Sequence, residues 1–223
     1  RAVYMNVDKE LVVNLVMNQA KNIWDYVLDR NVLAEGVEEA LNKCESSFSR
    51  YSNLVLRNNF NPYHSVQYSI FLYHLSRFMF KNNYMKEADV VYYLNKNLNS
   101  VEWFYGVDLP RYFGAEHPLG SVLGKAKYSD YLFVYQGTTI GGNRHGETLY
   151  YPKLGENIMM YAHSSIIGDC NIGNNVIIAA NTHVINRDIP DNCIVYGRDR
   201  DIQIVLKTEK EIKERLKAIW DFE

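Results

Sequence analysis

The sequence predicts an α+β protein in three parts: an α-helical region at residues 1–107, a parallel β-helix at residues 108–206, and a closing helix at residues 207–223. Three observations predict this fold class. In the first hundred residues, apolar residues recur at intervals of three and four residues, which is helical spacing. After Leu109 they recur every six residues, which is the period of a β-helix. A single polar loop interrupts that second period.

Helical spacing begins near Asp8 and continues to about Ser100. It is clear in the run Leu11, Val12, Leu15 and Val16, and we expect further helices at residues 37–48, 63–81 and 86–98. Many Tyr and Phe residues lie in these segments. Aromatic residues at helical spacing are typical of packing between helices, so we assign them to the core.

The six-residue period places an apolar or aromatic residue at Val122, Tyr128, Val134 and Ile140, and again, without exception, at Leu154, Met160, Ile166, Ile172, Ile178 and Val184. Such a period fits a prism with faces made of short parallel strands, in which three hexads complete one coil. Small or β-branched residues at the fifth position let the wall approach its neighbours, and Gly or Asn suits the corners, where φ is positive. Flat outer walls of this kind need partners or caps.

The closing helix is indicated by Ile212, Leu216 and Ile219, which share one face of the segment 207–222.

Composition excludes several classes of protein. The net charge is −2 with 22% charged residues, so we expect no nucleic-acid partner. Apolar runs are far shorter than the roughly 20 residues that span a bilayer, and the first five residues lack the features of a secretory leader, so we expect a cytoplasmic protein. Cys44, Cys170 and Cys193 have neither zinc-site nor disulfide spacing. We expect buried thiols and no metal.

The loop between Ile140 and Leu154 contains Arg144, His145, Tyr150 and Tyr151. Loops inserted into a rigid solenoid usually contribute to a site, although a tolerated surface insertion is the alternative.

Upstream, His117 is followed by Pro118 and lies at the entry to the coils. Imidazole has a pKa near neutrality, as a general base for a hydroxyl nucleophile requires. A carboxylate usually orients such a base, and Asp108 is the candidate, with Glu116 as runner-up.

Several segments occur in a distinctive order. They are Val107-Asp108-Leu109, His117 with Gly120, Gln136 to Gly142, the polar loop, Tyr151 to Asn157, Ile166 to Asn175, and Asp188 to Asn192. In this order the chain resembles the serine acetyltransferases, a family of hexapeptide-repeat acyltransferases with a left-handed parallel β-helix.

The resemblance implies an acetyl-CoA-dependent O-acetyltransferase that transfers the acetyl group directly, with no metal. It implies that His117 is the catalytic base and Asp108 its partner. It also implies that Glu116 holds the amino group of a small-molecule acceptor, although the family carries an aspartate there. Arg144 and His145 resemble a pair that helps to hold the acceptor.

The loop departs from the family pattern, because Gly146 to Tyr151 separate Arg144 and His145 from Pro152. Tyr150 and Tyr151 then stand where the pair normally lies. Tyrosines suit a sugar, since their rings pack on a pyranose and their hydroxyls form hydrogen bonds. The alternatives are therefore an O-acetyltransferase acting on a saccharide or nucleotide sugar in surface polysaccharide synthesis, and a non-catalytic trimeric scaffold.

The resemblance further implies a homotrimer, or a dimer of trimers, with CoA in the groove between subunits. Ala179 and Ala180 would form the wall of that groove, and Lys207 or Arg198 would bind the nucleotide phosphates.

Overall fold

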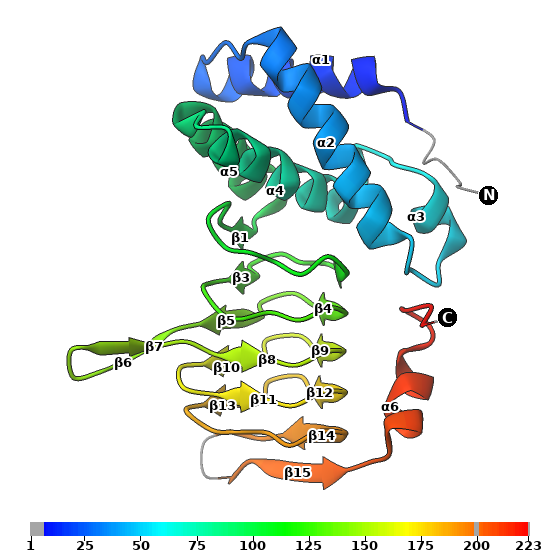
Figure 1. Cartoon of the computed structure of the whole chain (residues 1–223), viewed down its shortest axis with the longest axis vertical. Helices are drawn as coiled ribbons and strands as arrows, with labels where there is room; N and C mark the ends of the chain where they lie inside the picture. The colour runs from blue at the N-terminus through cyan, green and yellow to red at the C-terminus, as the bar shows by residue number, and fades with distance from the viewer. Residues whose placement is uncertain (1–6, 199–200, 223) are drawn as a thin grey trace.

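A computed structural model describes residues 7–198 and 201–222, and Figure 1 shows a helical half stacked on one end of a β-helix. The helices of the first half are α1 (Lys9–Trp24), α2 (Arg30–Phe48), α3 (Leu54–Asn58), α4 (Ser65–Lys81) and α5 (Met85–Asn99). The predicted fold class is confirmed. Our expectation for the first five residues lies outside the described residues.

Helix α4 is the centre of the helical half, because it packs against both α2 and α5. Its residues Tyr68, Phe71 and Tyr73 are buried, as the assignment of the aromatic residues to the core predicts. The first two helices begin at aspartate caps, with Asp8 accepting from the Leu11 amide and Asp29 from the Asn31 and Val32 amides.

The strands that follow form the three faces of a prism. One face contains β1 (Glu102–Trp103), β3 (Val122–Leu123), β5 (Thr139–Gly141), β10 (Ser165–Ile167) and β13 (His183–Ile185). A second contains β2 (Phe113–Ala115), β4 (Leu132–Val134), β9 (Ile158–Met160), β12 (Val176–Ile178) and β14 (Cys193–Tyr196), with β15 (Gln203–Leu206) added antiparallel at its end. The third contains β8 (Lys153–Leu154) and β11 (Asn171–Ile172).

The hexad pattern sets the register of these coils. Val176 pairs with Ile158, 18 residues earlier, as three hexads per coil require. The inward residues Ile140, Ile166, Ile178 and Val184 are fully buried. The expectation is wrong by one residue at Val122: Leu123 is the buried residue there, because the parallel register pairs Leu123 with Ile140.

The polar loop is an insertion at one corner of the prism. Thr139 pairs with Ser165, 26 residues further on, whereas an uninterrupted coil spans 18. The eight additional residues correspond to an antiparallel hairpin, formed by β6 (Asn143–His145) and β7 (Thr148–Tyr150). Figure 1 shows this hairpin projecting away from the body of the prism.

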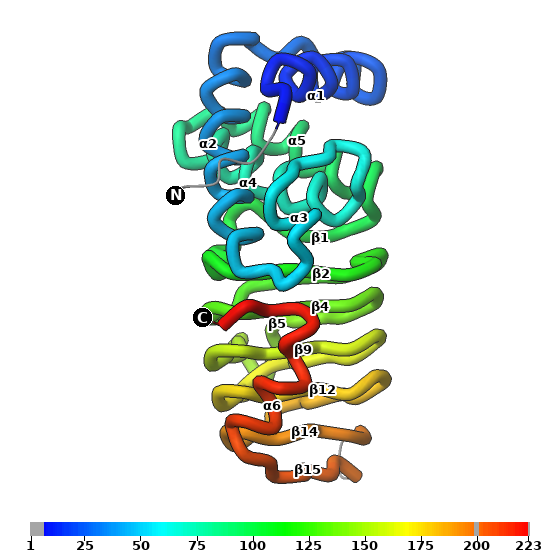
Figure 2. The backbone as a smooth tube through the Cα atoms, turned by 90° about the vertical axis from the view of Figure 1, so that its right-hand side faces the viewer, coloured from blue at the N-terminus to red at the C-terminus, as the bar shows by residue number. Residues whose placement is uncertain are grey.

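The closing helix is shorter than the predicted segment 207–223: α6 spans Glu209–Leu216. Ile212 and Leu216 are buried against the coils, but the chain then turns and continues as a tail without helical structure. Figure 2 shows this tail running back along the prism to α3, where Trp220 forms a bridge with Tyr51.

The three cysteines are free and buried, as predicted. None of the helices among residues 7–198 and 201–222 has both the length and the apolar character needed to cross a membrane.

Candidate active site

His117 lies at the corner of the prism between β2 and β3, with an exposed side chain and a backbone φ of 48°. The chain turns sharply here, since the Leu119 amide donates to the His117 carbonyl at 2.7 Å. The preceding Glu116 amide donates to the Val134 carbonyl and ties the corner to the next coil. His117 is thereby held at the mouth of a cavity of about 300 Å³.

The helical half forms one wall of this cavity. Asn53 caps α3 by accepting from the Val55 and Leu56 amides, and His64 caps α4 with its Nδ1 3.5 Å from the Gln67 amide nitrogen. Gln67 fixes the segment between the two helices, because its buried side chain amide donates to the Leu56 and Asn59 carbonyls. The wall is therefore held by buried hydrogen bonds.

The coils and the C-terminal tail form the other walls, through Ala115, Phe133, Ala218 and Ile219. The Ser52 amide donates to the Ile219 carbonyl at 2.9 Å, which fixes the tail against the helical half. Gly114 must lack a side chain here, because an added Cβ would lie 2.5 Å from the Tyr51 hydroxyl oxygen.

Two imidazoles, one carboxylate and the Ser65 hydroxyl line the cavity together, the imidazoles from His117 and His64 and the carboxylate from Glu116. Glu116 accepts a hydrogen bond of 2.7 Å from the Tyr135 hydroxyl, and the Tyr135 ring stacks on Tyr161 at 5.2 Å. Burial and this hydrogen bond both raise the pKa of Tyr135, so its hydroxyl stays protonated and donates.

Sequence reasoning did not find His64. Its place at the start of a predicted helix is a signal, but that position favours a capping role as readily as a role in a site.

The predicted pairing of Asp108 with His117 is not formed within the chain. Asp108 lies in the connection from β1 to β2, where its carboxylate, 84% exposed, is 2.5 Å from Arg77. His117 follows β2 and lines a cavity that Asp108 does not reach. Nine residues separate the two, which is one and a half hexads, so they fall at different corners of a prism with six residues to a face.

The hairpin residues do not meet His117 within the chain either. Arg144, His145 and Tyr150 are exposed, and Tyr151 is half-buried, with the Lys125 ammonium 4.8 Å from its ring centroid. In Figure 1 the hairpin projects to the left, whereas α3 and the tail that line the His117 cavity lie to the right.

Ala179 and Ala180 lie in the turn that connects β12 to β13, where the Thr182 amide donates to the Ala179 carbonyl. Arg198 Nε donates to the Asn181 carbonyl in the same turn, at 3.3 Å. Lys207, by contrast, is 3.5 Å from Glu211 at the start of α6.

Among the described residues, no group of three or more His, Cys, Asp or Glu side chains is placed to hold a metal ion.

Sequence comparison finds relatives of this chain among known enzymes. The serine acetyltransferase of Synechococcus elongatus is 35% identical over 106 residues, which cover 47% of this chain and 43% of that protein. The serine acetyltransferase of Staphylococcus epidermidis is 28% identical over 120 residues, covering 53% of this chain and 56% of that protein. Over about half of its length the chain is similar in sequence to serine acetyltransferases. It matches about half the length of these relatives, and no protein-family model matches it.

Solved serine acetyltransferases share the fold over most of the chain. The enzyme from Neisseria gonorrhoeae has a TM-score of 0.69 at 18% identity, covering 92% of this chain and 83% of that one. The enzyme from Brucella abortus has a TM-score of 0.68 at 16% identity, covering 90% and 84%. A serine acetyltransferase solved in complex with CoA has a TM-score of 0.66 at 16% identity, covering 88% and 84%. The similarity therefore includes the helical half as well as the coils.

Proposed function

We propose that the protein is an acetyl-CoA-dependent O-acetyltransferase of the serine acetyltransferase type. The observation that carries this proposal is the cavity at the first coils, where the exposed imidazole of His117 and the carboxylate of Glu116 line one space. Homology to serine acetyltransferases supports the same reaction class.

In the proposed reaction His117 accepts the proton of the acceptor hydroxyl while the hydroxyl oxygen attacks the acetyl carbonyl carbon. The tetrahedral adduct collapses, the carbon–sulfur bond breaks, and His117 returns the proton to the CoA thiolate. No covalent acetyl-enzyme is formed. A base at a cavity mouth suits this chemistry, because the acceptor and the thioester must approach it from different sides.

Glu116 is proposed to bind the ammonium group of the acceptor. The hydrogen bond from the Tyr135 hydroxyl holds the Glu116 carboxylate in place. A carboxylate can accept several hydrogen bonds, so Glu116 can also accept from an ammonium group. For Asp108, the family role of orienting the base is not supported within one chain, because Asp108 and His117 line different cavities. The proposal therefore depends on His117 and not on the dyad.

Assembly into a homotrimer is part of the proposal. An isolated two-stranded hairpin is marginally stable in water, and the β6–β7 hairpin leaves Leu149 40% and Tyr150 38% exposed. Contact with another chain would bury these side chains. Packed against a neighbour, the hairpin would bring Arg144 and His145 to the acceptor cavity of that chain, where they would bind the carboxylate of serine.

The donor is proposed to bind along the turn of Ala179 and Ala180, where the small side chains leave the backbone accessible. The solved complex of a serine acetyltransferase with CoA supports acetyl-CoA as donor. Of the two basic candidates, Arg198 contacts this turn, whereas Lys207 lies beside Glu211 at the start of α6. The three buried free thiols fit a reducing compartment, so we propose a cytoplasmic location.

A saccharide acceptor is the second candidate, favoured by the exposed Tyr150 and the half-buried Tyr151 on the hairpin. The first experiment measures thiol release from acetyl-CoA with L-serine and then with a panel of sugars and nucleotide sugars. Release with serine supports the first candidate, and release with a sugar alone supports the second. Absence of release with every acceptor would contradict both and favour the scaffold.

A mixing experiment tests whether sites are shared between chains. A His117→Ala chain and a chain with Arg144→Ala and His145→Ala should each be inactive, but co-refolded at equal amounts they should regain about one quarter of the sites, as a cyclic trimer with shared sites requires. No recovery would show that the hairpin does not complete a neighbouring chain's site.

A further inference from the structure

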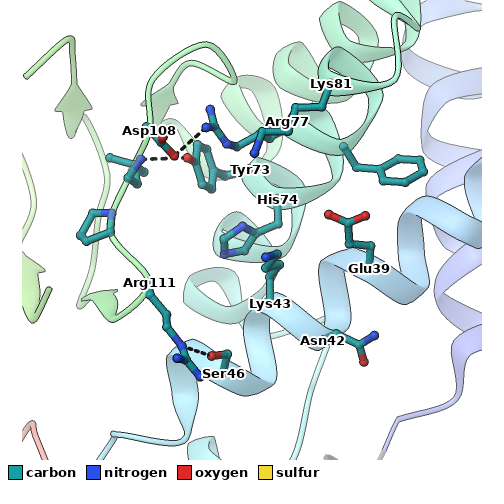
Figure 3. Close-up of a pocket in the computed structure, with 13 residues that line it drawn as sticks. Glu39, Asn42, Lys43, Ser46, Tyr73, His74, Arg77, Lys81, Asp108 and Arg111 are labelled. Carbon is teal, nitrogen blue, oxygen red and sulfur yellow. Dashed lines mark hydrogen bonds and ion pairs between the residues drawn. The ribbon is translucent and has the colours of Figure 1, made fainter. Parts of the chain in front are cut away.

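A second and larger cavity, of about 660 Å³, lies between α2, α4 and the connection from β1 to β2. Figure 3 shows the side chains that line it. It shares no lining residue with the His117 cavity. Its volume is within the range of roughly 300–1,000 Å³ that small-molecule sites occupy.

Cationic side chains predominate around this cavity. They are Lys43 from α2, Lys81 and Arg77 from α4, and Arg111 from the segment before β2. The carboxylates that line it are Glu39 and Asp108, so the lining has a net charge of about +2.

These carboxylates do not neutralise the lysines. Asp108 forms its ion pair with Arg77, and Glu39 has no cation within ion-pair distance among the described contacts. Lys43 and Lys81 likewise have no ion-pair partner in the part of the chain that the structure describes. Two ammonium groups without an ion-pair partner therefore line a concave surface of net positive charge, an arrangement that attracts anions.

The floor of the cavity contains His74, whose Nε2 is buried and has no hydrogen-bond partner among the described residues. Burial, together with the nearby Lys43, Arg77 and Lys81, lowers the pKa of His74 to about 3. The ring is therefore neutral near pH 7 and adds no positive charge to the cavity. Figure 3 shows His74 between α2 and the side chains of Tyr73 and Arg77.

The far wall is rigid. Arg77 donates to the Tyr105 and Val107 carbonyls at 2.9 and 3.1 Å, and its side chain is only 14% exposed. The Tyr73 hydroxyl donates to the Val107 carbonyl and accepts from the Leu109 amide. These contacts hold Arg77 and Tyr73 in place, so a ligand would lose little free energy in ordering this wall.

We propose that this cavity binds a small, multiply charged anion of metabolite size, held chiefly by the ammonium groups of Lys43 and Lys81 over His74. Lysine binds phosphoryl groups as a point charge, and two uncompensated lysines match the double charge of such a group. Glu39 lies at the same cavity and would oppose binding. The site is separate from the proposed acetyl-transfer site and does not depend on that activity.

The test is calorimetric titration of the whole chain with pyrophosphate at low ionic strength. We expect saturable binding with one site per chain, and a loss of about tenfold in affinity for each of Lys43→Met and Lys81→Met. Glu39→Gln should tighten binding by about threefold, because it removes a repelling charge. Lys86→Met, on α5 and outside the cavity, is the matched control and should change nothing.

Inorganic phosphate and citrate serve as further probes. Tighter binding of phosphate would indicate a phosphoryl ligand, and tighter binding of citrate would indicate a carboxylate ligand. Absence of saturable binding for all three anions would overturn the proposal. Binding that persists in the Lys43→Met, Lys81→Met double variant would also overturn it. Competition between pyrophosphate and desulfo-CoA would show that the cavity is the donor site, which contradicts a separate anion site.

Discussion

His74 should make the protein less stable as the pH falls below neutrality. Its pKa is about 3 in the folded chain, because burial disfavours the imidazolium. In the unfolded chain a histidine titrates near 6.5. Between these values the unfolded chain binds a proton that the folded chain does not, so lowering the pH favours unfolding.

The magnitude follows from the two pKa values. Each unit of difference contributes about 1.4 kcal/mol, so lowering the pH from 7 to 5 should reduce the free energy of unfolding by at most about 2 kcal/mol. His74 is half-buried and lines the cavity, and water there weakens the effect. We therefore expect a loss of about 1 kcal/mol over these two pH units.

Urea unfolding at pH 7, 6 and 5, followed by circular dichroism, measures this loss. The His74→Gln variant should show a smaller decrease than the parent chain, whatever its stability at pH 7. His145→Gln, which changes an exposed imidazole on the hairpin, should retain the parent slope. Equal slopes for the parent and His74→Gln would refute the reasoning, because His74 would then be accessible to protons in the folded chain.

Activity and packing can be perturbed at three other places. His117→Ala should lower acetyl transfer by about two to four orders of magnitude with an unchanged elution volume, and near-normal turnover would remove His117 from the mechanism. Deleting Asn143 to Tyr150 should preserve the melting temperature, because the coil closes without these residues, and should abolish turnover; a large fall in melting temperature would show that the coil depends on the hairpin. Gly114→Ala should cost about 1–3 kcal/mol of stability in denaturant titration, since its methyl would crowd Tyr51; an unchanged midpoint would mean that Tyr51 moves aside freely.

The coils could be predicted from the sequence because the hexad rule is local. An apolar residue such as Ile178 every six positions requires one inward face for each hexad, and the parallel register follows from stacking. The error at Val122 arises because Leu123 pairs with Ile140, 17 residues further on, so this coil is one residue shorter than three hexads.

The site was harder to predict because it depends on contacts between segments far apart in the sequence. His117 could be recognised from its neighbours, but His64 reaches the same cavity only through the packing of α3 and α4 on the coils. The separation of Asp108 from His117 follows from the corner at which each residue falls, which a linear motif does not reveal. Likewise, no spacing rule predicts that Lys43 and Lys81 line one cavity.

The C-terminal tail alters how the molecule should come apart. In a stack of coils each layer contacts only its neighbours, so the last layer can usually fray without disturbing the first. Here the tail returns from the last coil to the helical half, where Arg57 binds Asp221 at 2.7 Å and Ile219 accepts from Ser52. The two ends of the linear array are thereby joined, and fraying from the far end must also release the wall of the His117 cavity. Loss of the last coil and loss of that cavity should consequently occur as one cooperative event.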